Sequence, residues 1–353
     1  MNWKTDEEYN KYKKLVGSAT AQQIIRKNNE AWKSFFALLK KKKKGELPHH
    51  IKKIKPPGYW KDRRTNRRIL RIFIRCDCYK LGGDMLKLPF GLNIRWKGKN
   101  RWKGKQGRLE IIFDELNRSW YAFQPVKVQP LHQPLGNKKA YCDLGARVLI
   151  MEEIDGEIFG YKGNSLLADW WYWTKKIAKY QSMLKENNNK HTSRQLRLLY
   201  RKRKRRFRHA VNTVVSRFVH MCWLKGISEI IIGDLISIRD NNNKGKKANT
   251  IVHNFWSHNY LTQRIKNKAE EYGLRVIVVD ESFTSSLCPR CSSRHIVKRK
   301  RLFKCLNCGL EAHRDAVGCV NIRLAQGEHL AGVINGAVAR PLLFAVGTSH
   351  ALE

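Results

Sequence analysis

Four cysteines in the C-terminal third of the sequence have the spacing of a metal site. They form two C-x-x-C pairs, Cys288 with Cys291 and Cys305 with Cys308, and thirteen residues separate the pairs. Each pair can present two thiolate sulfurs to one ion, and four thiolates suit the tetrahedral coordination of Zn²⁺. Because four cysteines leave no coordination position open, the spacing predicts a structural zinc ribbon at 285–312 and not a catalytic zinc.

Acidic residues at the predicted ends of strands and helices form a second candidate site. Asp143 follows the segment AYC, Asp234 ends the apolar run IIIG, Asp280 and Glu281 end RVIVV, and Asp315 begins the predicted helix HRDAVGCVNIRLA. Taken singly, each acid is more often a helix cap or a surface charge. Hydrolysis of a phosphodiester by two Mg²⁺ ions requires acids from separate elements to converge where the ions can lie about 4 Å apart. The order of these positions therefore favours a magnesium site of the nuclease kind.

The charge of the chain indicates a polyanionic partner. Its 353 residues include 71 lysines and arginines against 29 acids, a formal charge of +42, and a 10% aromatic content argues against a disordered basic tail. A nucleic acid would relieve the self-repulsion; a ribosome-associated or membrane-surface protein is the alternative. No run approaches the roughly 20 apolar residues of a membrane span, and the polar N-terminus is not a secretory signal. The other five cysteines are scattered, so we expect a reducing compartment such as the cytoplasm.

Two segments combine basic residues with features suited to nucleic acid. The repeat RWKGKNRWKGK, 95–105, alternates tryptophan with lysine, so bases could stack on the indoles while lysines contact phosphates. A hairpin whose tryptophans cover a sheet face is an equally good interpretation. The predicted helix RQLRLLYRKRKRRFRHAVNTVVSRFVHMCW carries an unbroken basic run that favours a groove against a phosphate backbone. The candidate contacts are Trp96, Trp102, Lys97, Lys99, Lys103, Lys105, Arg201, Arg203, Arg205 and Arg206.

The elements that must position these residues alternate between strands and helices. Periodicity predicts a helix over 18–44, β structure from about 67 to 130, and a strand, a turn and a second strand in KKAYCDLGARVLIMEEIDGEIFGY. A long helical stretch over 163–224, broken at 187–193, leads to the strand EIIIGDL. A helix around 258–272 and the strand GLRVIVVDESF follow. This alternation predicts a mixed α/β sheet. The residues after about 325 show little periodicity, and we expect them to be weakly ordered.

The motifs together resemble a known family. The D-x-G at Asp143–Gly145, the apolar strand ending in an acid, TSSLCPRC, CLNCG and HRDAVGCVNI are similar to the RuvC nuclease domain of TnpB, a transposon-encoded RNA-guided DNA nuclease related to type V CRISPR effectors. The resemblance covers at least 138–325 and implies an α/β, RNase H-like RuvC domain with the zinc ribbon at 285–312 inserted before its last acid. It also implies a helical recognition segment at 1–60, a small β-barrel-like wedge domain at 61–137 and a tail at 326–353.

The resemblance also implies cofactors and partners. These are a guide RNA from a transposon end or a CRISPR-type array, a target DNA read mostly by base pairing, structural Zn²⁺ and catalytic Mg²⁺. Carried over by position, Asp143 is the first catalytic acid and Asp315 the last. Many members end the middle strand in Glu-Asp-Leu, with the glutamate as second ligand, but here Gly233 holds that position. Adjacent strand residues face opposite ways, so Asp234 should not simply replace that glutamate. In some relatives with Gly-Asp here, the acid lies on the neighbouring strand just before the Thr-Ser, and by that resemblance the second acid is Glu281 in VVDESFTSSLC, with Asp234 as the alternative.

A second departure from the family lies at the N-terminus. Only about seventeen residues precede the helix that starts near position 18, where the family usually has a first wedge strand and more helical recognition sequence, so we expect either an incomplete wedge or a trimmed segment. The leading hypothesis is an RNA-guided DNA endonuclease. The alternatives are an RNA-guided DNA-binding protein that has lost cleavage, which Gly233 and the short N-terminus suggest, and a guide-free DNA-binding accessory protein or transposase.

Overall fold

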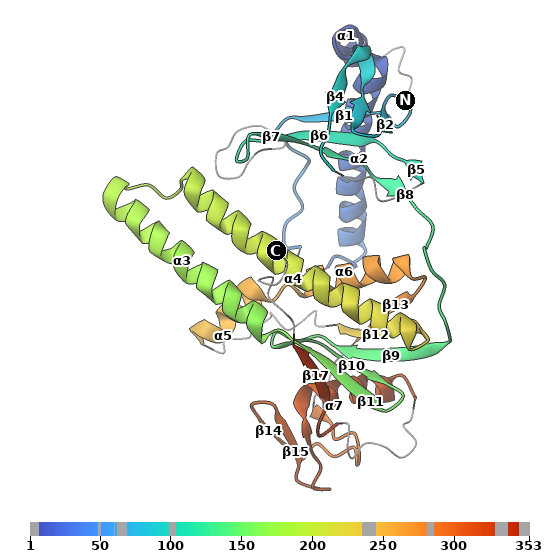
Figure 1. Ribbon diagram of the computed structural model, residues 1–353, viewed down its shortest axis with the longest axis vertical. Helices are drawn as coiled ribbons and strands as arrows, with labels where there is room; N and C mark the ends of the chain where they lie inside the picture. The colour runs from blue at the N-terminus through green and yellow to red at the C-terminus, as the bar shows by residue number, and fades with distance from the viewer. Residues whose placement is uncertain are drawn as a thin grey trace. The chain divides into compact units, whose positions relative to one another are not determined.

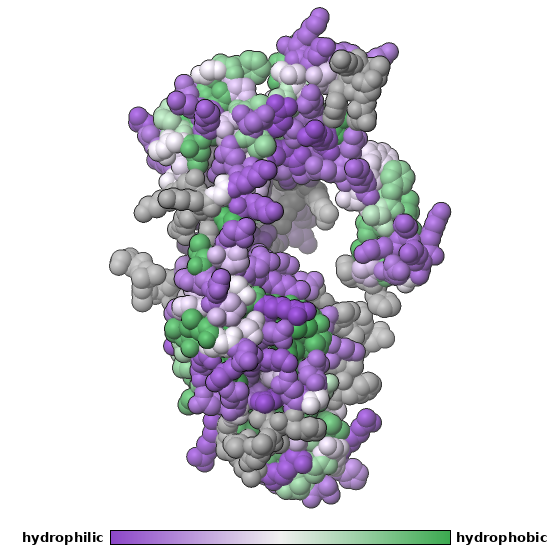
Figure 2. All heavy atoms as spheres, turned by 90° about the vertical axis from the view of Figure 1, so that its right-hand side faces the viewer, coloured by the Kyte–Doolittle hydropathy of each residue, from purple (hydrophilic) through white to green (hydrophobic). Residues whose placement is uncertain are grey.

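The computed structural model describes residues 7–48, 51–59, 61, 69–98, 104–234, 245–280, 286–328 and 338–345 (Figure 1). The chain divides into two compact units, Met1–Gln129 and Pro130–Glu353. Hydrophilic side chains cover most of the face drawn in Figure 2, as expected for a chain with a formal charge of +42. Among the residues that the structure describes, no helix is long and apolar enough to cross a membrane.

The first unit joins two helices to three small sheets. Helix α2 carries its salt bridges on one side, where Lys27 and Glu30 reach Glu110 and Arg108 beside strand β6. These contacts enclose Phe73, which is almost fully buried. The elements are α1 (Glu7–Val16), α2 (Ser18–Lys43), β1 (Arg71–Ile74), β2 (Lys80–Gly82), β3 (Met85–Lys87), η2 (Pro89–Gly91), β4 (Asn93–Arg95), β5 (Lys105–Gln106), β6 (Leu109–Asp114), β7 (Ser119–Phe123) and β8 (Val126–Lys127). The sheets have the orders β1-β6-β7, β2-β3-β4 and β5-β8.

The second unit is built on a six-stranded mixed sheet of order β13-β12-β9-β10-β11-β17. The strands are β9 (Lys138–Asp143), β10 (Val148–Ile154), β11 (Glu157–Lys162), β12 (Ile227–Asp234), β13 (Arg275–Asp280) and β17 (Leu342–Ala345). The first three pair antiparallel, whereas β12 runs parallel to both β9 and β13, and β17 runs parallel to β11. This arrangement places the ends of β9, β12 and β13 at the same edge.

Helices cover both faces of this sheet. The helices are α3 (Asn164–Asn188), α4 (Arg194–Leu224), α5 (Lys246–Thr250), η3 (Ile251–Phe255), α6 (His258–Glu271) and α7 (Arg314–Ala325). The larger core lies between the sheet and helices α4 and α6, with Phe218 and Ile265 at its centre. On the opposite face α7 packs against the strands together with the small sheet β14-β15-β16, whose strands span Ile296–Arg299, Leu302–Cys305 and Glu311–His313. Helices α3 and α4 form a long hairpin (Figure 1).

Two parts of the second unit differ from the pattern read in the sequence. The segment 138–162 holds three strands where a strand, a turn and a second strand are predicted, because β10 and β11 form a hairpin at Asp155-Gly156. Both turn residues have positive φ, 51° and 88°, the conformation that an Asp-Gly pair adopts most readily. The second difference is β17, which lies in the region where little order is expected; Leu342–Ala345 pair with β11.

Candidate functional site

The carboxylate of Asp143 lies against helix α7. Asp143 is the last residue of β9, and its register partner on β10 is Met151, whose side chain belongs to the core beneath α7. A Cβ atom built on Gly318 of α7 would lie only 2.6 Å from Asp143 Oδ2. Glycine at 318 therefore permits this close approach of the carboxylate to the helix. Asp315 precedes Gly318 by three residues, about one helical turn, so the two predicted acids come from adjacent elements.

Asp315 begins α7 and is nearly buried, with 8% of its surface exposed. A carboxylate is favoured in the first turn of a helix because unpaired backbone N–H groups give that end a partial positive charge. The Arg301 guanidinium also donates to it, with Nη1 at 2.7 Å from Oδ1 and 2.5 Å from Oδ2. Arg301 belongs to the turn between β14 and β15, so the cysteine-bearing segment contributes directly to the surroundings of this acid.

Asp234 and Asp280 lie on the other face of the sheet. Ile230 and Ile232 of β12 belong to the core beneath α4 and α6, whereas Ile231 belongs to the cluster beneath α7. Because β12 and β13 keep one register up to the Asp234–Asp280 pair, strand alternation points both acids to the α4 side, away from Asp143.

Glu281, the predicted second acid, lies outside the described residues, which end at Asp280 and resume at 286. Within the described ranges, no group of three acids has its oxygens within 4.8 Å of one another. The described part of the site therefore consists of Asp143 and Asp315, with Gly318 between them and Arg301 on the second acid.

A buried ion pair fixes α7 to the sheet near these acids. Arg323 Nη1 donates to Glu153 Oε1 at 2.8 Å, and Glu153 is fully buried on β10. The backbone N–H of Gly156 donates to the same oxygen at 2.7 Å. Burial raises the pKa of Glu153, and the hydrogen bond from Gly156 and the charge of Arg323 oppose that rise. The Arg323 guanidinium also lies 5.6 Å from the centre of the Tyr141 ring, two residues before Asp143.

The neighbouring Glu152 lies in the opposite core among neutral groups. The Tyr161 hydroxyl donates to its Oε1 at 3.3 Å, and the Cys222 thiol donates to its Oε2 at 3.4 Å. Burial raises the pKa of Glu152 to about 7, and the two hydrogen bonds and the more distant Lys225 charge oppose that rise only in part. Glu152 therefore titrates near neutral pH inside the core, which is uncommon for a carboxyl group.

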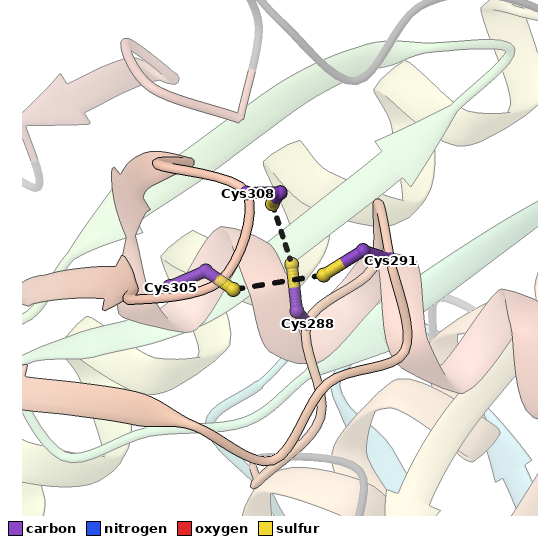
Figure 3. A group of neighbouring side chains, drawn as sticks. All are labelled: Cys288, Cys291, Cys305 and Cys308. Carbon is purple, nitrogen blue, oxygen red and sulfur yellow. Dashed lines mark hydrogen bonds between the residues drawn. The ribbon is translucent and has the colours of Figure 1, made fainter.

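The four cysteines of the predicted ribbon converge as their spacing predicts (Figure 3). Their sulfurs all lie within 4.8 Å of one another, and the Cys288–Cys308 and Cys291–Cys305 Sγ–Sγ distances are both 3.6 Å. Two ligands of a tetrahedral ion with Zn–S bonds of about 2.3 Å lie about 3.8 Å apart, so the group fits zinc.

Backbone turns shape the cysteine group. The Ser292 N–H donates to the Cys288 carbonyl at 2.9 Å, and the Gly309 N–H donates to the Cys305 carbonyl at 3.1 Å. Hydrogen bonds from the Ser293 backbone and the Asn307 side chain lower the pKa of Cys291 to about 6, which favours the thiolate that binds metal.

The predicted basic contacts on α4 fall into two groups. Arg203 and Arg206 face α3: Arg203 Nη1 donates to Thr174 Oγ1 at 2.8 Å, and Arg206 binds the Asp169 carboxylate through Nε and Nη2. Burial lowers the pKa of Arg203, while the hydrogen bond with Asp169 raises that of Arg206. Arg205 is exposed, and Arg201 is half-buried. Arg203 and Arg206 thus join the two helices, and their contact with nucleic acid stays a prediction.

The tryptophan repeat is described only in its first half. Trp96 is partly buried against the core of the β2-β3-β4 sheet, next to Tyr79 and Leu86, and its Nε1 is buried without a hydrogen-bond partner. This position agrees with the alternative interpretation of the repeat, in which the indole covers a sheet face. Lys97 is exposed beside it. Trp102, Lys99 and Lys103 lie outside the described residues, so base stacking at this repeat stays a prediction.

Sequence reasoning missed several residues of the site. Glu152 and Glu153 occur in the apolar strand VLIMEEI, and two acids within such a run are a signal for buried carboxyl groups. Gly318 within a predicted helix is a similar signal of close backbone approach. The partnership of Arg301 with Asp315 has no comparable signal, because Arg301 is one of several basic residues in RHIVKRKRLFK.

The sheet, its two helical layers and the four-cysteine group define a mixed α/β protein with a candidate metal cluster. Residues 258–322 match the family described as "Cas12f1-like, TNB domain", and residues 123–239 match the family described as "Probable transposase". The TnpB-like protein ORF457 of Acidianus two-tailed virus is 36% identical over 372 aligned positions, which span 96% of this chain and 78% of the viral protein. The chain belongs to the TnpB family, as its motifs predict.

More distant relatives cover smaller parts of the chain. The CRISPR-associated endodeoxyribonuclease Cas12f1 of Sulfoacidibacillus thermotolerans is 35% identical over 121 residues, 33% of this chain and 27% of that protein. Among solved structures, a Cas12f1–sgRNA–target DNA complex has a TM-score of 0.42 and 15% sequence identity, and the match covers 90% of this chain and 82% of that chain.

Proposed function

We propose that the protein is an RNA-guided DNA endonuclease, which cleaves DNA complementary to a bound RNA by Mg²⁺-dependent hydrolysis. The observation that carries the proposal is the meeting of Asp143 and α7: the Asp143 carboxylate lies against Gly318, about one turn from Asp315 on the same helix. The parallel strands β9, β12 and β13 end at this edge. Acids at such an edge are held in place by the sheet.

The strand order supports a RuvC-type domain. Apart from the edge strand β17, the sheet has the order β11-β10-β9-β12-β13, in which β9, β10 and β11 are antiparallel and β12 and β13 run parallel to β9, the arrangement of RNase H-like folds. We retain the division into a recognition segment at 1–60, a wedge at 61–137, a RuvC domain at 138–325 and a tail at 326–353 as part of the proposal.

The residues of the site fit a hard divalent cation. Carboxylate oxygens are the ligands that Mg²⁺ prefers, and Asp315 already tolerates a cationic group, the Arg301 guanidinium, on both of its oxygens. Asp143 and Asp315 would hold the metal, which when bound supplies water activation and stabilisation of the leaving oxygen. The contact of the Asp143 carboxylate with α7 at Gly318 orients Asp143. Asp315 is oriented by its hydrogen bonds from Arg301 and by its position in the first turn of α7.

Glu281 remains our candidate for the second acid. Ile232 pairs with Cys142, so the next residue, Gly233, lies beside Asp143 and offers no side chain. Val279 on β13 belongs to the cluster beneath α7. If the alternation continues past Asp280, position 281 lies on the face of Asp143. Asp234 is the weaker candidate, because its register places it on the α4 side.

The proposal of an RNA guide rests on relatives and charge. One relative is named as a CRISPR-associated endodeoxyribonuclease, and the chain belongs to the TnpB family. Residues 164–208 of the α3–α4 hairpin include fourteen lysines and arginines but only two acids, a composition suited to a nucleic-acid backbone. In such proteins base pairing reads the target sequence while the protein holds the duplex through its backbone. The zinc ribbon would be structural, since four thiolates leave no open position.

Purified protein with its co-purifying RNA tests the proposal directly. After that RNA is sequenced, matched and mismatched DNA are supplied with Mg²⁺ or with EDTA. We expect cleavage of matched DNA only, dependent on Mg²⁺, and none with Asp143→Asn. Tight binding of matched DNA without a cut by the wild-type protein would favour the RNA-guided binding protein that has lost cleavage. DNA affinity that survives RNase treatment would favour a guide-free protein.

A further inference from the structure

The cysteine-bearing segment delivers a positive charge to Asp315. Arg301 lies in the turn between β14 and β15, and its Nη1 contacts both carboxylate oxygens, at 2.7 and 2.5 Å. The Arg301 side chain is 37% exposed, whereas that of Asp315 is only 10% exposed. Both oxygens that could bind a metal therefore already have a charged partner.

The backbone of the segment keeps Arg301 beside the start of α7. The Arg314 N–H donates to the Arg301 carbonyl at 2.8 Å, and Leu302 pairs with His313 across β15 and β16. Cys305, a predicted zinc ligand, is the last residue of β15. Strand β15, which ends in a predicted zinc ligand, thus also fixes the position of the Arg301 backbone. The Arg301 guanidinium therefore stays within reach of Asp315 even when the Arg301 side chain changes its conformation.

A nearly buried carboxylate requires a counter-charge. Without one, the desolvation of the anion is uncompensated, and the loss of one partner from a buried pair is strongly unfavourable. A guanidinium and a divalent cation can each meet this requirement, but one carboxylate in a confined site does not offer the same oxygens to both. The two partners should therefore compete for Asp315.

We propose that Arg301 is a positioning residue that acts as the counter-ion of Asp315 until a divalent cation takes its place, so that metal loading is an exchange of one cation for another. The inference rests on the proposed function, because it takes Asp315 as a metal ligand. It adds that the zinc-binding segment sets the metal affinity of the carboxylate site. Arg301 keeps the carboxylate oriented in the metal-free protein and lowers its apparent affinity for metal.

Titration of the zinc-loaded full chain with Mn²⁺, without nucleic acid, tests the proposal. Arg301→Ala should bind Mn²⁺ about three- to tenfold more tightly than the wild type, the range expected when a partly exposed ion pair no longer competes. Arg301→Lys should fall between them, because it keeps the charge but loses the planar fork. The rise in Tm on adding Mn²⁺ should be larger for Arg301→Ala. Lys304→Ala is the matched control, because Lys304 lies on the same hairpin but pairs with Glu311.

Unchanged or weaker Mn²⁺ binding by a folded Arg301→Ala variant would overturn the inference, since either result excludes competition. If that variant does not fold, Arg301→Lys carries the test, with tighter binding still required. Asp315→Asn separates the two proposals. If it leaves Mn²⁺ binding and cleavage unchanged, Asp315 is not a ligand and the proposed function fails. If it abolishes both while the Arg301 variants bind like the wild type, only the inference about Arg301 fails.

Discussion

The two faces of the β9–β13 sheet accommodate buried acids in opposite ways, and strand β10 shows the contrast in two consecutive residues. Glu153 faces α7 and pairs with Arg323 at 2.8 Å. Glu152 faces α4, accepts hydrogen bonds from the neutral Tyr161 and Cys222 side chains, and has a pKa raised to about 7 by burial. The α7 face supplies cations to its acids, whereas the α4 face favours the uncharged acid. A metal binds the ionised form of a carboxyl group, and cationic partners favour that form, so the α7 face is the better place for a metal-dependent reaction.

Loss of the proposed zinc should cause the largest change on the α7 face. Cys305→Ser should abolish stoichiometric zinc binding and unfold the β14-β15-β16 sheet, because zinc contributes about 10 kcal/mol or more to small domains of this kind. Elemental analysis and amide hydrogen exchange measure the two effects. Cys76→Ser, in the first unit, should retain the zinc. Full zinc loss with unchanged protection of residues 296–313 would show that the ribbon folds without metal.

Asp143→Asn should lower the rate of target cleavage by on the order of 10³-fold at saturating Mg²⁺, because one charged ligand of the metal is lost. Zinc content and affinity for target DNA should stay unchanged. Asp155→Asn is a control with the same substitution, because Asp155 lies in the β10–β11 turn and pairs with Lys138, at the opposite end of β9 from Asp143. Cleavage within tenfold of the wild type would remove Asp143 from the catalytic role.

A comparison of Glu281→Gln with Asp234→Asn tests which face provides the second acid. We expect on the order of 10²-fold slower cleavage for Glu281→Gln and a change within about twofold for Asp234→Asn, because the register of β12 points Asp234 to the α4 side. Single-turnover rates with bound guide RNA measure both. If Asp234→Asn slows cleavage more than Glu281→Gln does, the second metal ligand lies on the α4 side, and the site is not confined to the α7 face.

The smallest effects concern stability, and substitutions of the two adjacent glutamates should differ in the size of their pH-dependent effect. Glu152 has a folded pKa of about 7, above its ordinary value of 4.5. The contribution of Glu152 to the free energy of unfolding is therefore fully present below pH 4.5 and is lost as pH rises through 7. The loss is about 3 kcal/mol, at about 1.36 kcal/mol per pKa unit. The Glu152→Gln variant does not undergo this loss. The difference in free energy of unfolding between the variant and the wild type should therefore shift by about 3 kcal/mol in favour of the variant between pH 4.5 and pH 8.

Glu153→Gln should show a smaller shift over the same pH range, because the Gly156 N–H and the Arg323 charge oppose the rise in the pKa of Glu153. Urea unfolding of both variants at several pH values measures the difference. Equal effects of the two substitutions at pH 8 would contradict the contrast between the faces.

The parts of the site that depend on local spacing could be predicted from the sequence. The C-x-x-C pairs converge because each pair lies within one turn, and the start of α7 at Arg314 follows from the helical pattern around Asp315. The break between α3 and α4 lies where the polar segment 187–193 predicts it. The signal for the β10–β11 hairpin was present as Asp155-Gly156, but the apolar run around it favoured a single strand.

Partnerships across the fold could not be predicted. Arg301 and Asp315 are fourteen residues apart, and their contact depends on how the hairpin β14–β15 packs beside α7. Arg203 and Arg206 share the composition of a nucleic-acid contact, but their partners Thr174 and Asp169 lie on another helix. Composition gives the number of charges in a segment, whereas packing decides which of them remain available to a ligand.

Strand β17 has a consequence for attempts to shorten this protein. Leu342–Ala345 pair in parallel with β11, and Leu343 Cδ2 lies 2.6 Å from the position of a Cβ built on Gly160. Deletion of the C-terminal residues from 338 onward would expose the backbone N–H and C=O groups of β11 along an edge that bears Phe159 and Tyr161. Such an edge recruits strands from other molecules. A compact variant designed for delivery should therefore keep residues 338–345, or replace β17 with a charged strand.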